Sequence, residues 1–317
     1  MKKHWINLII VLFIPFSLFA QVDLSTSQGG STSSQEKAAK FGEAFFDEES
    51  RDIMERGICT TMEMDALLRS NNPDLGSLEE FEMYLQEEIA RYNEGLKSGR
   101  ITDEILTIPV VIHVIHNGEP VGFGPNLSAE QVQSQIDAMN EHFRKVGTGA
   151  NDNPFGADVE IEFAPAIWDM NGQRMPEPGI DRVNGNKEDW NQLAIQAILK
   201  ERTIWDPFQY FNIWTVKFGD QSQGLLGYAQ FPSQSGLDGL GENEGTESTD
   251  GVVINYRTFG TTSNVPKPYH EGKITSHEVG HWLGLRHVWG DGKCNMDDYC
   301  EDTPNCSDAS WSSMFLG

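Results

Sequence analysis

Positive charge is scarce in this chain of 317 residues. Its 23 Lys and Arg residues stand against 48 Asp and Glu residues, and the formal net charge is -25. Nucleic acids and anionic membrane surfaces repel a protein of this charge, so we expect neither as a partner. The charge favours solubility but says little about the fold.

Long apolar runs are also missing, with one exception at the N-terminus. Two lysines near the start precede an apolar run from Trp5 to Phe19, and the small residue Ala20 follows. This pattern predicts a secretory signal peptide over residues 1–20, because the run is short for a membrane span; a membrane anchor is the alternative. We therefore expect a secreted protein with no membrane association after signal cleavage. Residues 21–40 begin with many Ser, Thr, Gln and Gly residues and predict a disordered leader.

The next segment has the periodicity of helices. Apolar residues recur every three or four positions from Ser77 to Leu96, and Ser77 with Glu80 fits a capping box at the start of this predicted helix. A shorter helical piece is expected around Met62 to Leu68. The polar stretch from Lys97 to Glu104 is interpreted as an exposed linker, which is a natural site for proteolytic cleavage.

From residue 105 onward the pattern changes to strands interleaved with helices. The β-branched run from Ile105 to His116 predicts a strand buried on both faces, and Ser128 is expected to cap an amphipathic helix. We therefore predict one α+β domain, with a mixed α/β arrangement, over residues 105–317. Further strands are predicted to begin at Val159, Tyr210, Leu225 and Gly251.

The stretch HEVGHWLGLRH holds three histidines and a glutamate at a spacing that suits a metal ion. His277 and His281 are four residues apart, so a helix projects both to one side. Gly284 can take the left-handed conformation that ends a helix, which lets His287 approach as the third ligand. Three neutral ligands leave a fourth position on Zn²⁺ for water, as in catalytic zinc sites. Glu278 can then take a proton from this water and return it to the leaving amine of a peptide bond.

A structural alternative exists for part of this pattern. Thr275 with Glu278 also matches a helix capping box, and HExxH alone occurs by chance in many helices. The full pattern HExxHxxGxxH has five fixed positions, and chance is then a poor explanation. We therefore interpret the stretch as a zinc site with Glu278 as its general base.

The same stretch resembles a known family. HExxHxxGxxH is the zinc signature of the metzincins, and HEVGHWLGLRH resembles its form in the pappalysin (cytophagalysin) branch. The stretches IPVVIHVIH, GIDRV, FNIWTV, GYAQFP and DDYCEDTP are similar to that branch as well. The resemblance implies a metzincin-like zincin catalytic domain with a twisted mixed β-sheet, a backing helix and an active-site helix. It also implies a secreted metalloendopeptidase whose protein or peptide substrates pair with an edge strand, LLGYAQFP.

Cys59 lies apart from the other three cysteines, ahead of the predicted domain. Family prosegments carry a similar Arg and a Cys-Thr pair, so residues 41–104 resemble a helical prosegment with a linker. The resemblance implies a zymogen with a cysteine switch, in which the Cys59 thiolate is an inhibitory zinc ligand that displaces the water. The alternative is a small buried apolar residue, since free cysteine is often that.

Acidic residues gather again after the motif. Asp297, Asp298 and Asp302, with Thr303, form a candidate calcium loop, because carboxylates interleaved with backbone carbonyls suit Ca²⁺. Some relatives in the family bind calcium in this region, while an acidic surface loop is the alternative. Three cysteines lie in the same region: Cys294, Cys300 and Cys306. We expect a disulfide between two of them, or between one of them and a partner outside this chain.

The chain ends at SSMFLG without a stretch that resembles the methionine turn of the family. The surroundings of Met314 differ from that turn, so we expect a truncated sequence. This expectation raises a second hypothesis, a secreted zinc-binding or protein-binding fragment with impaired or no catalysis. Substrate specificity and oligomeric state are not predicted by the sequence.

Overall fold

The structure is a computed structural model whose described part begins at Cys59. It describes residues 59–71, 76–100, 104–147, 156–219, 222, 224–231, 247–291, 296–300 and 303. Several predictions lie outside these residues and stay predictions: the signal peptide over residues 1–20, the leader over residues 21–40, Cys294, Asp302 and Cys306.

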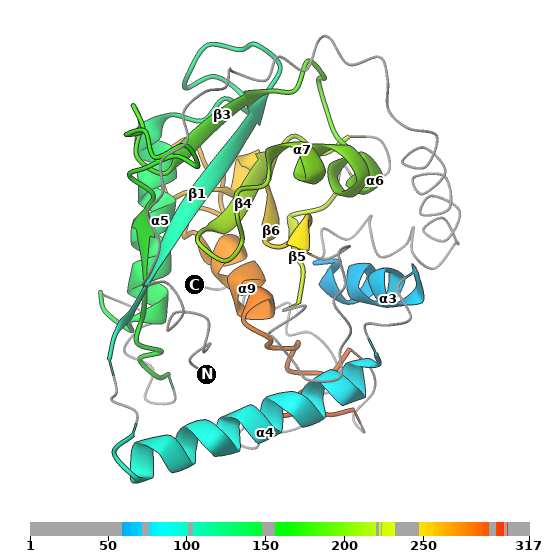
Figure 1. Cartoon of the computed structure of the whole chain (residues 1–317). Coiled ribbons are helices and arrows are strands. Elements are labelled where there is room, and N and C mark those ends of the chain that lie inside the picture. The colour runs from blue at the N-terminus through cyan, green and yellow to red at the C-terminus, as the bar shows by residue number, and fades with distance from the viewer. Residues whose placement is uncertain are drawn as a thin grey trace.

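A long central strand organises the sheet of the described residues (Figure 1). Strand β1 (Leu106–His116) pairs in parallel with β2 (Ile161–Pro165) along its first half and with β3 (Ile180–Asn184) along its second half. The predicted strands β1 and β2 are confirmed, but only Val110 to Ile115 of β1 are buried on both faces, because Thr107 and Pro109 near its start are exposed. Strand β3 has only five residues and a partly exposed pattern, so periodicity did not predict it.

Three further strands lie on the other side of β1 and extend to the edge of the sheet. Strand β4 (Phe211–Val216) pairs in parallel with β1, and β6 (Val252–Asn255) pairs in parallel with β4. Strand β5 (Gly227–Ala229) is antiparallel to β6 and ends the strand order β2-β1-β4-β6-β5. The short turn η7 (Tyr256–Thr258) follows β6. These pairings confirm the predicted α+β class, and they place the expected edge strand at the edge.

Helices cover both faces of the sheet. One face carries Val110 and Ile112 and packs against α5 (Ala129–Phe143) and α9 (Lys273–Trp282) in a single core. The opposite face carries Ile115, and the two faces alternate along β1 because successive side chains of a strand point to opposite sides. A short helical run covers this opposite face: α6 (Gln192–Ala194), η5 (Ile195–Lys200) and α7 (Glu201–Thr203).

Two helices precede the sheet in the chain. Helix α3 is Thr61–Asn71, and α4 is Leu78–Lys97. The predicted capping box of α4 is confirmed, because the Glu80 amide donates to Ser77 Oγ and the Ser77 amide donates to Glu80 Oε2. Figure 1 shows α4 lying across one end of the domain, beside the chain that follows α9. None of the helices in the described residues is long and apolar enough to span a bilayer.

Candidate metal centre and active site

Helix α9 and the turn after it bring three imidazoles together. The Nε2 atom of His281 lies 3.1 Å from Nε2 of His277 and 3.2 Å from Nε2 of His287. Gly284 makes this possible with a φ of 99°, a left-handed conformation that favours glycine. Its amide donates to the carbonyl of His281, and the next amide, that of Leu285, donates to the carbonyl of Gly280, so the helix ends in a Schellman turn.

A fourth group comes from the N-terminal segment. The Cys59 Sγ atom and one nitrogen of each of the three histidines all lie within 4.8 Å of one another. This is the single group of that kind among the described residues. The structure therefore brings together every zinc ligand that the sequence predicted, including the cysteine from the segment ahead of the domain.

Two of the histidines have a second partner that orients the ring. The Nδ1 atom of His281 lies 2.7 Å from the carbonyl oxygen of Leu285, which can only accept a hydrogen bond. The Nδ1 atom of His287 lies 2.5 Å from Oδ1 of Asp291. Both contacts place the proton on Nδ1 and leave the lone pair of Nε2 directed at the cluster. Asp291 had no predicted role at the zinc site; its position four residues after His287 was the available signal.

His277 and His281 favour the neutral form that a metal ion needs. Burial and the neighbouring imidazoles lower the pKa of His281 well below its usual value. Burial of its ionisable ring and the proximity of His287 lower the pKa of His277 to about 4, although the residue as a whole is exposed. At neutral pH both side chains therefore offer a free lone pair without first losing a proton.

Glu278 lies beside the cluster, with 1% of its surface exposed. Burial raises the pKa of its carboxyl group to about 8. Strand β5 packs closely here, because a Cβ at Gly227 would lie 3.0 Å from Cγ of Glu278 and 2.9 Å from the carbonyl oxygen of Val253. A carboxyl group with a raised pKa next to a metal site is the usual arrangement of a proton-transferring residue.

The N-terminal segment covers this carboxyl group. Thr61 donates from Oγ1 to Glu278 Oε2 at 3.1 Å, and the Cys59 thiol donates to the same oxygen at 3.4 Å. Thr61 Oγ1 in turn accepts from the amide of Ala229 at 2.9 Å. Thr61 was missed by sequence reasoning, since nothing in a single threonine predicts a contact with a helix so far along the chain.

The same segment occupies the outer side of the edge strand. Cys59 forms a parallel bridge with Gly227 of β5. The segment thus lies where the sequence predicted that an extended substrate would pair. Burial and the nearby Glu278 carboxylate raise the pKa of the Cys59 thiol well above its usual value.

The candidate calcium residues do not converge in the described part of the chain. Asp297 Oδ1 accepts from the amide of Tyr299, and Asp298 Oδ1 accepts from the amide of Cys300, so each carboxylate closes a local turn. Thr303 is described, and its amide donates to the carbonyl of Cys300 at 3.0 Å. Calcium binding and the disulfide of this region stay predictions.

A buried glutamate and a histidine cluster beside an edge strand define the class of zincin-type metallopeptidases. Comparisons with known proteins then identify the family. The family model described as pregnancy-associated plasma protein-A matches residues 196–314. The chain belongs to the pappalysin family of metallopeptidases.

Curated relatives are extracellular metalloproteases. The protein of Arthroderma gypseum is 42% identical over 217 residues, which are 65% of this chain and 57% of that protein. The protein of Verticillium alfalfae is 30% identical over 222 residues, which are 69% of this chain and 64% of that protein. The chain spans 59% of the length of three further curated relatives, from Arthroderma otae, Arthroderma benhamiae and Trichophyton verrucosum.

Solved structures agree with this family. Mature mirolysin of Tannerella forsythia in complex with a cleaved peptide is 35% identical, with a TM-score of 0.56. The match covers 66% of this chain and 75% of that one. A promirolysin mutant of the same organism is 32% identical, with a TM-score of 0.55, and the match covers 74% of this chain and 77% of that one.

Proposed function

We propose that this chain is a secreted zinc-dependent endopeptidase that is made as a latent zymogen. The observation that carries the proposal is the convergence of three imidazole Nε2 atoms beside the buried carboxyl group of Glu278. The extracellular metalloproteases among the relatives support secretion and the signal peptide predicted over residues 1–20.

The histidine cluster fits a zinc ion. Zinc–nitrogen bonds of about 2.0–2.1 Å in tetrahedral geometry would separate two nitrogen ligands by roughly 3.3–3.4 Å. The separations of 3.1 and 3.2 Å around Nε2 of His281 are close to that value. Three neutral nitrogens are the ligand set of catalytic zinc, and the fourth position is the one that Cys59 faces.

Glu278 would carry the proton in peptide hydrolysis. Zinc, when bound, supplies the Lewis acid that activates water at neutral pH. The Glu278 carboxylate would accept a proton at Oε2 and return it to the amine that leaves as the peptide bond breaks. In the structure Thr61 and Cys59 cover this carboxyl group, and burial raises its pKa to about 8. Departure of the segment would expose the group to water and lower that pKa, so that its carboxylate form could accept the proton.

Strand β5 would hold the substrate. An extended peptide that adds to a sheet edge gains backbone hydrogen bonds without regard to its sequence. The outer side of β5 carries the bridge between Cys59 and Gly227, and the Ala229 amide donates to Thr61. A substrate would therefore compete with the N-terminal segment for the same strand, and cleavage would follow only after the segment leaves.

Latency would come from Cys59 as the fourth zinc ligand. A thiol with a raised pKa keeps its proton, but zinc binds thiolate sulfur strongly and would release that proton on binding. Residues 41–104 would thus be a prosegment ahead of the catalytic domain. The match to promirolysin covers 74% of this chain and the match to mature mirolysin covers 66%, which supports a shared N-terminal segment.

The test compares the full chain with its Glu278→Gln variant after cleavage of the linker and removal of the N-terminal segment. Bound zinc is measured by native mass spectrometry, and hydrolysis of casein is measured with and without a chelator. We expect zinc in both proteins and chelator-sensitive hydrolysis only with Glu278 present. Zinc binding without hydrolysis in either protein would instead support the fragment hypothesis, and absence of zinc from both would refute the proposed site.

A further inference from the structure

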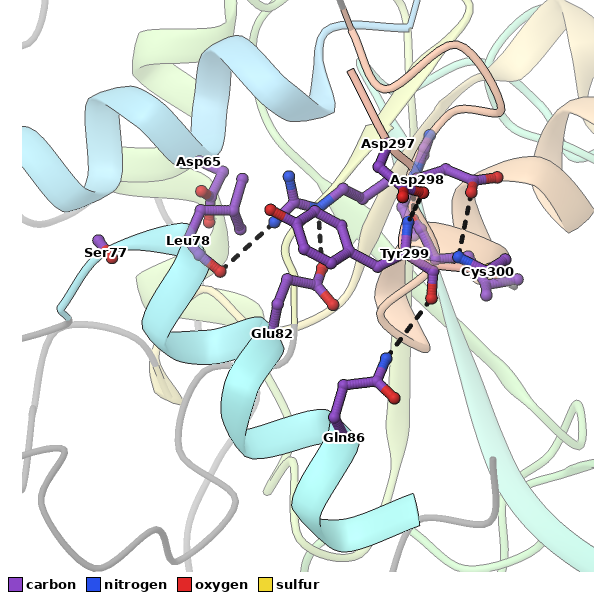
Figure 2. A network of polar contacts seen from close by, with 12 residues as sticks. Asp65, Ser77, Leu78, Glu82, Gln86, Asp297, Asp298, Tyr299 and Cys300 are labelled. Carbon is purple, nitrogen blue, oxygen red and sulfur yellow. Dashed lines mark hydrogen bonds and ion pairs between the residues drawn. The ribbon is translucent and has the colours of Figure 1, made fainter. Parts of the chain in front are cut away.

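A buried ion pair joins α4 to the zinc motif. This contact is separate from the contacts that Cys59 makes. Arg286 Nε lies 2.7 Å from Glu82 Oε1, and the two side chains are 5% and 6% exposed. Figure 2 labels Glu82 on α4, and its partner Arg286 belongs to the chain that follows α9. Two charges withdrawn from water in this way are stable only while each has the other as its partner.

Other contacts of α4 surround this pair (Figure 2). The carbonyl of Leu78 accepts from Nη2 of Arg286 at 3.4 Å, and Gln86 Nε2 donates to the carbonyl of Tyr299 at 3.5 Å. The guanidinium group also lies over the Tyr299 ring, with 4.4 Å from its central carbon to the ring centroid. Leu78, Glu82 and Gln86 are spaced by four residues, so they form one face of α4.

The ion pair and the Cys59 contact belong to one connected segment. Arg69 of α3 pairs with Asp65 at 2.7 Å, and its Nη1 atom donates to the carbonyls of Gly76 and Ser77 at the start of α4. Helix α3 begins two residues after Cys59. Helices α3 and α4 are thus connected to each other, and α4 is held at Arg286. This arrangement resists movement of Cys59 away from the histidines.

We propose that Glu82 and Arg286 form a second attachment of the prosegment, which needs no metal and holds the prosegment in place after the linker is cut. The inference rests on the proposed zymogen function. Two attachments on one segment strengthen each other. When one contact breaks, the other keeps the released group close to its binding site, so the broken contact can form again. In the parent protein, cleavage of the linker alone would then yield a complex that is still inhibited, and full activity would require a further cut in the segment or its dissociation.

The experiment measures retention of the cleaved segment and needs no enzymatic activity. A recognition sequence for a site-specific protease is inserted after Gly99, an exposed position where a Cβ would meet nothing within 4 Å. All proteins carry Glu278→Gln to prevent self-cleavage. After cleavage, the C-terminal part is captured by an affinity tag, and the rate at which the N-terminal part dissociates is measured.

Four proteins are compared: the parent, Cys59→Ala, Glu82→Gln and the double variant. We expect Cys59→Ala, or chelation of zinc in the parent, to leave the segment bound. The double variant should release it roughly thirtyfold faster than Cys59→Ala or more, as truncating one partner of a buried charge pair does. Arg286→Met in the Cys59→Ala background should give the same acceleration from the other side of the pair.

Glu87→Gln is the matched control, because Glu87 is on the same helix in an exposed pair with Arg91. It should leave release unchanged. In the Cys59→Ala background, equal release rates for Glu82→Gln and Glu87→Gln would overturn the second attachment, as would full release from Cys59→Ala alone. Circular dichroism of the uncleaved proteins checks that each variant is folded. Failure of the proposed function would appear separately, as absent hydrolysis by the chain with Glu278 once the N-terminal segment has been removed.

Discussion

Cys59 Sγ lies 3.4 Å from Oε2 of Glu278, although 219 positions separate the two residues in the sequence. The same sulfur is part of the group that can hold a metal ion. One thiol therefore faces both parts of the proposed catalytic apparatus, the metal ligands and the general base. An inhibitory segment placed in this way would exclude water from the metal and substrate from β5 together.

Replacement of the proposed base should separate metal binding from catalysis. Glu278→Gln keeps the size of the side chain but cannot accept the proton, so hydrolysis of a fluorogenic peptide should fall roughly 10²–10⁴-fold. Zinc content should stay unchanged, because Glu278 is not among the grouped ligands. Glu271→Gln, an exposed carboxylate just before α9, is the control. Normal activity in the Glu278 variant would end its assignment as the base.

Loss of the thiol should weaken latency. Cys59→Ala removes the proposed fourth zinc ligand, and we expect early self-cleavage near the exposed stretch from Lys97 to Arg100. Mass spectrometry of the new N-terminus would locate the cut. The same variant combined with Glu278→Gln should stay intact, since it lacks the base. Unchanged latency in Cys59→Ala would leave Cys59 as a buried residue without an inhibitory role.

Asp291 should raise the zinc affinity through His287. Asp291→Asn replaces the carboxylate that orients the ring at Nδ1, and loss of such a partner weakens metal binding by about 10–100-fold. Competition with a chromophoric chelator measures the affinity. Asp297→Asn serves as a control, because Asp297 accepts only from the amide of Tyr299 among the contacts described here. Equal affinities for the two variants would show that the ring needs no carboxylate.

The buried lysine of η5 should make stability depend on pH. Lys200 is fully buried, donates to the carbonyl of Thr249 at 2.8 Å and lies over the Trp214 ring. Burial lowers its pKa from 10.5 to about 7, so between these values the unfolded chain binds more protons than the folded chain. The free energy of unfolding therefore gains a term that rises with pH across this window.

The free energy of unfolding of the Lys200→Met variant lacks this pH-dependent contribution, because the titrating lysine is gone. The stability of the parent relative to Lys200→Met should increase as the pH rises from about 7 to 10, measured by urea unfolding at each pH. Lys97→Met, at an exposed position, should differ from the parent by a constant amount. A constant difference for Lys200→Met as well would contradict the lowered pKa.

Local patterns accounted for most of the elements. The capping box at Ser77 and the apolar spacing after it predicted α4, and the continuous apolar run predicted β1. Both signals depend on neighbours within a few residues, which is why they are visible in the sequence. Strand β3 was missed because it is short, and its pairing with the second half of β1 is a contact between distant segments.

The zinc ligands on α9 could be read from the sequence for the same reason. Helical spacing places His277 and His281 on one side, and Gly284 turns the chain so that His287 returns to them. The sequence thus determined the histidine cluster and the candidate base, because each follows from spacing within eleven residues, and it indicated the family through resemblance.

Only the tertiary structure decided which distant groups meet these residues. It placed Thr61 on Glu278, Cys59 among the histidines and Glu82 on Arg286. The sequence suggested the second of these only through resemblance, and it contained no signal for the other two. Such contacts depend on how separate elements pack, and the packing follows from burial of apolar surface over the whole domain, which no local pattern encodes.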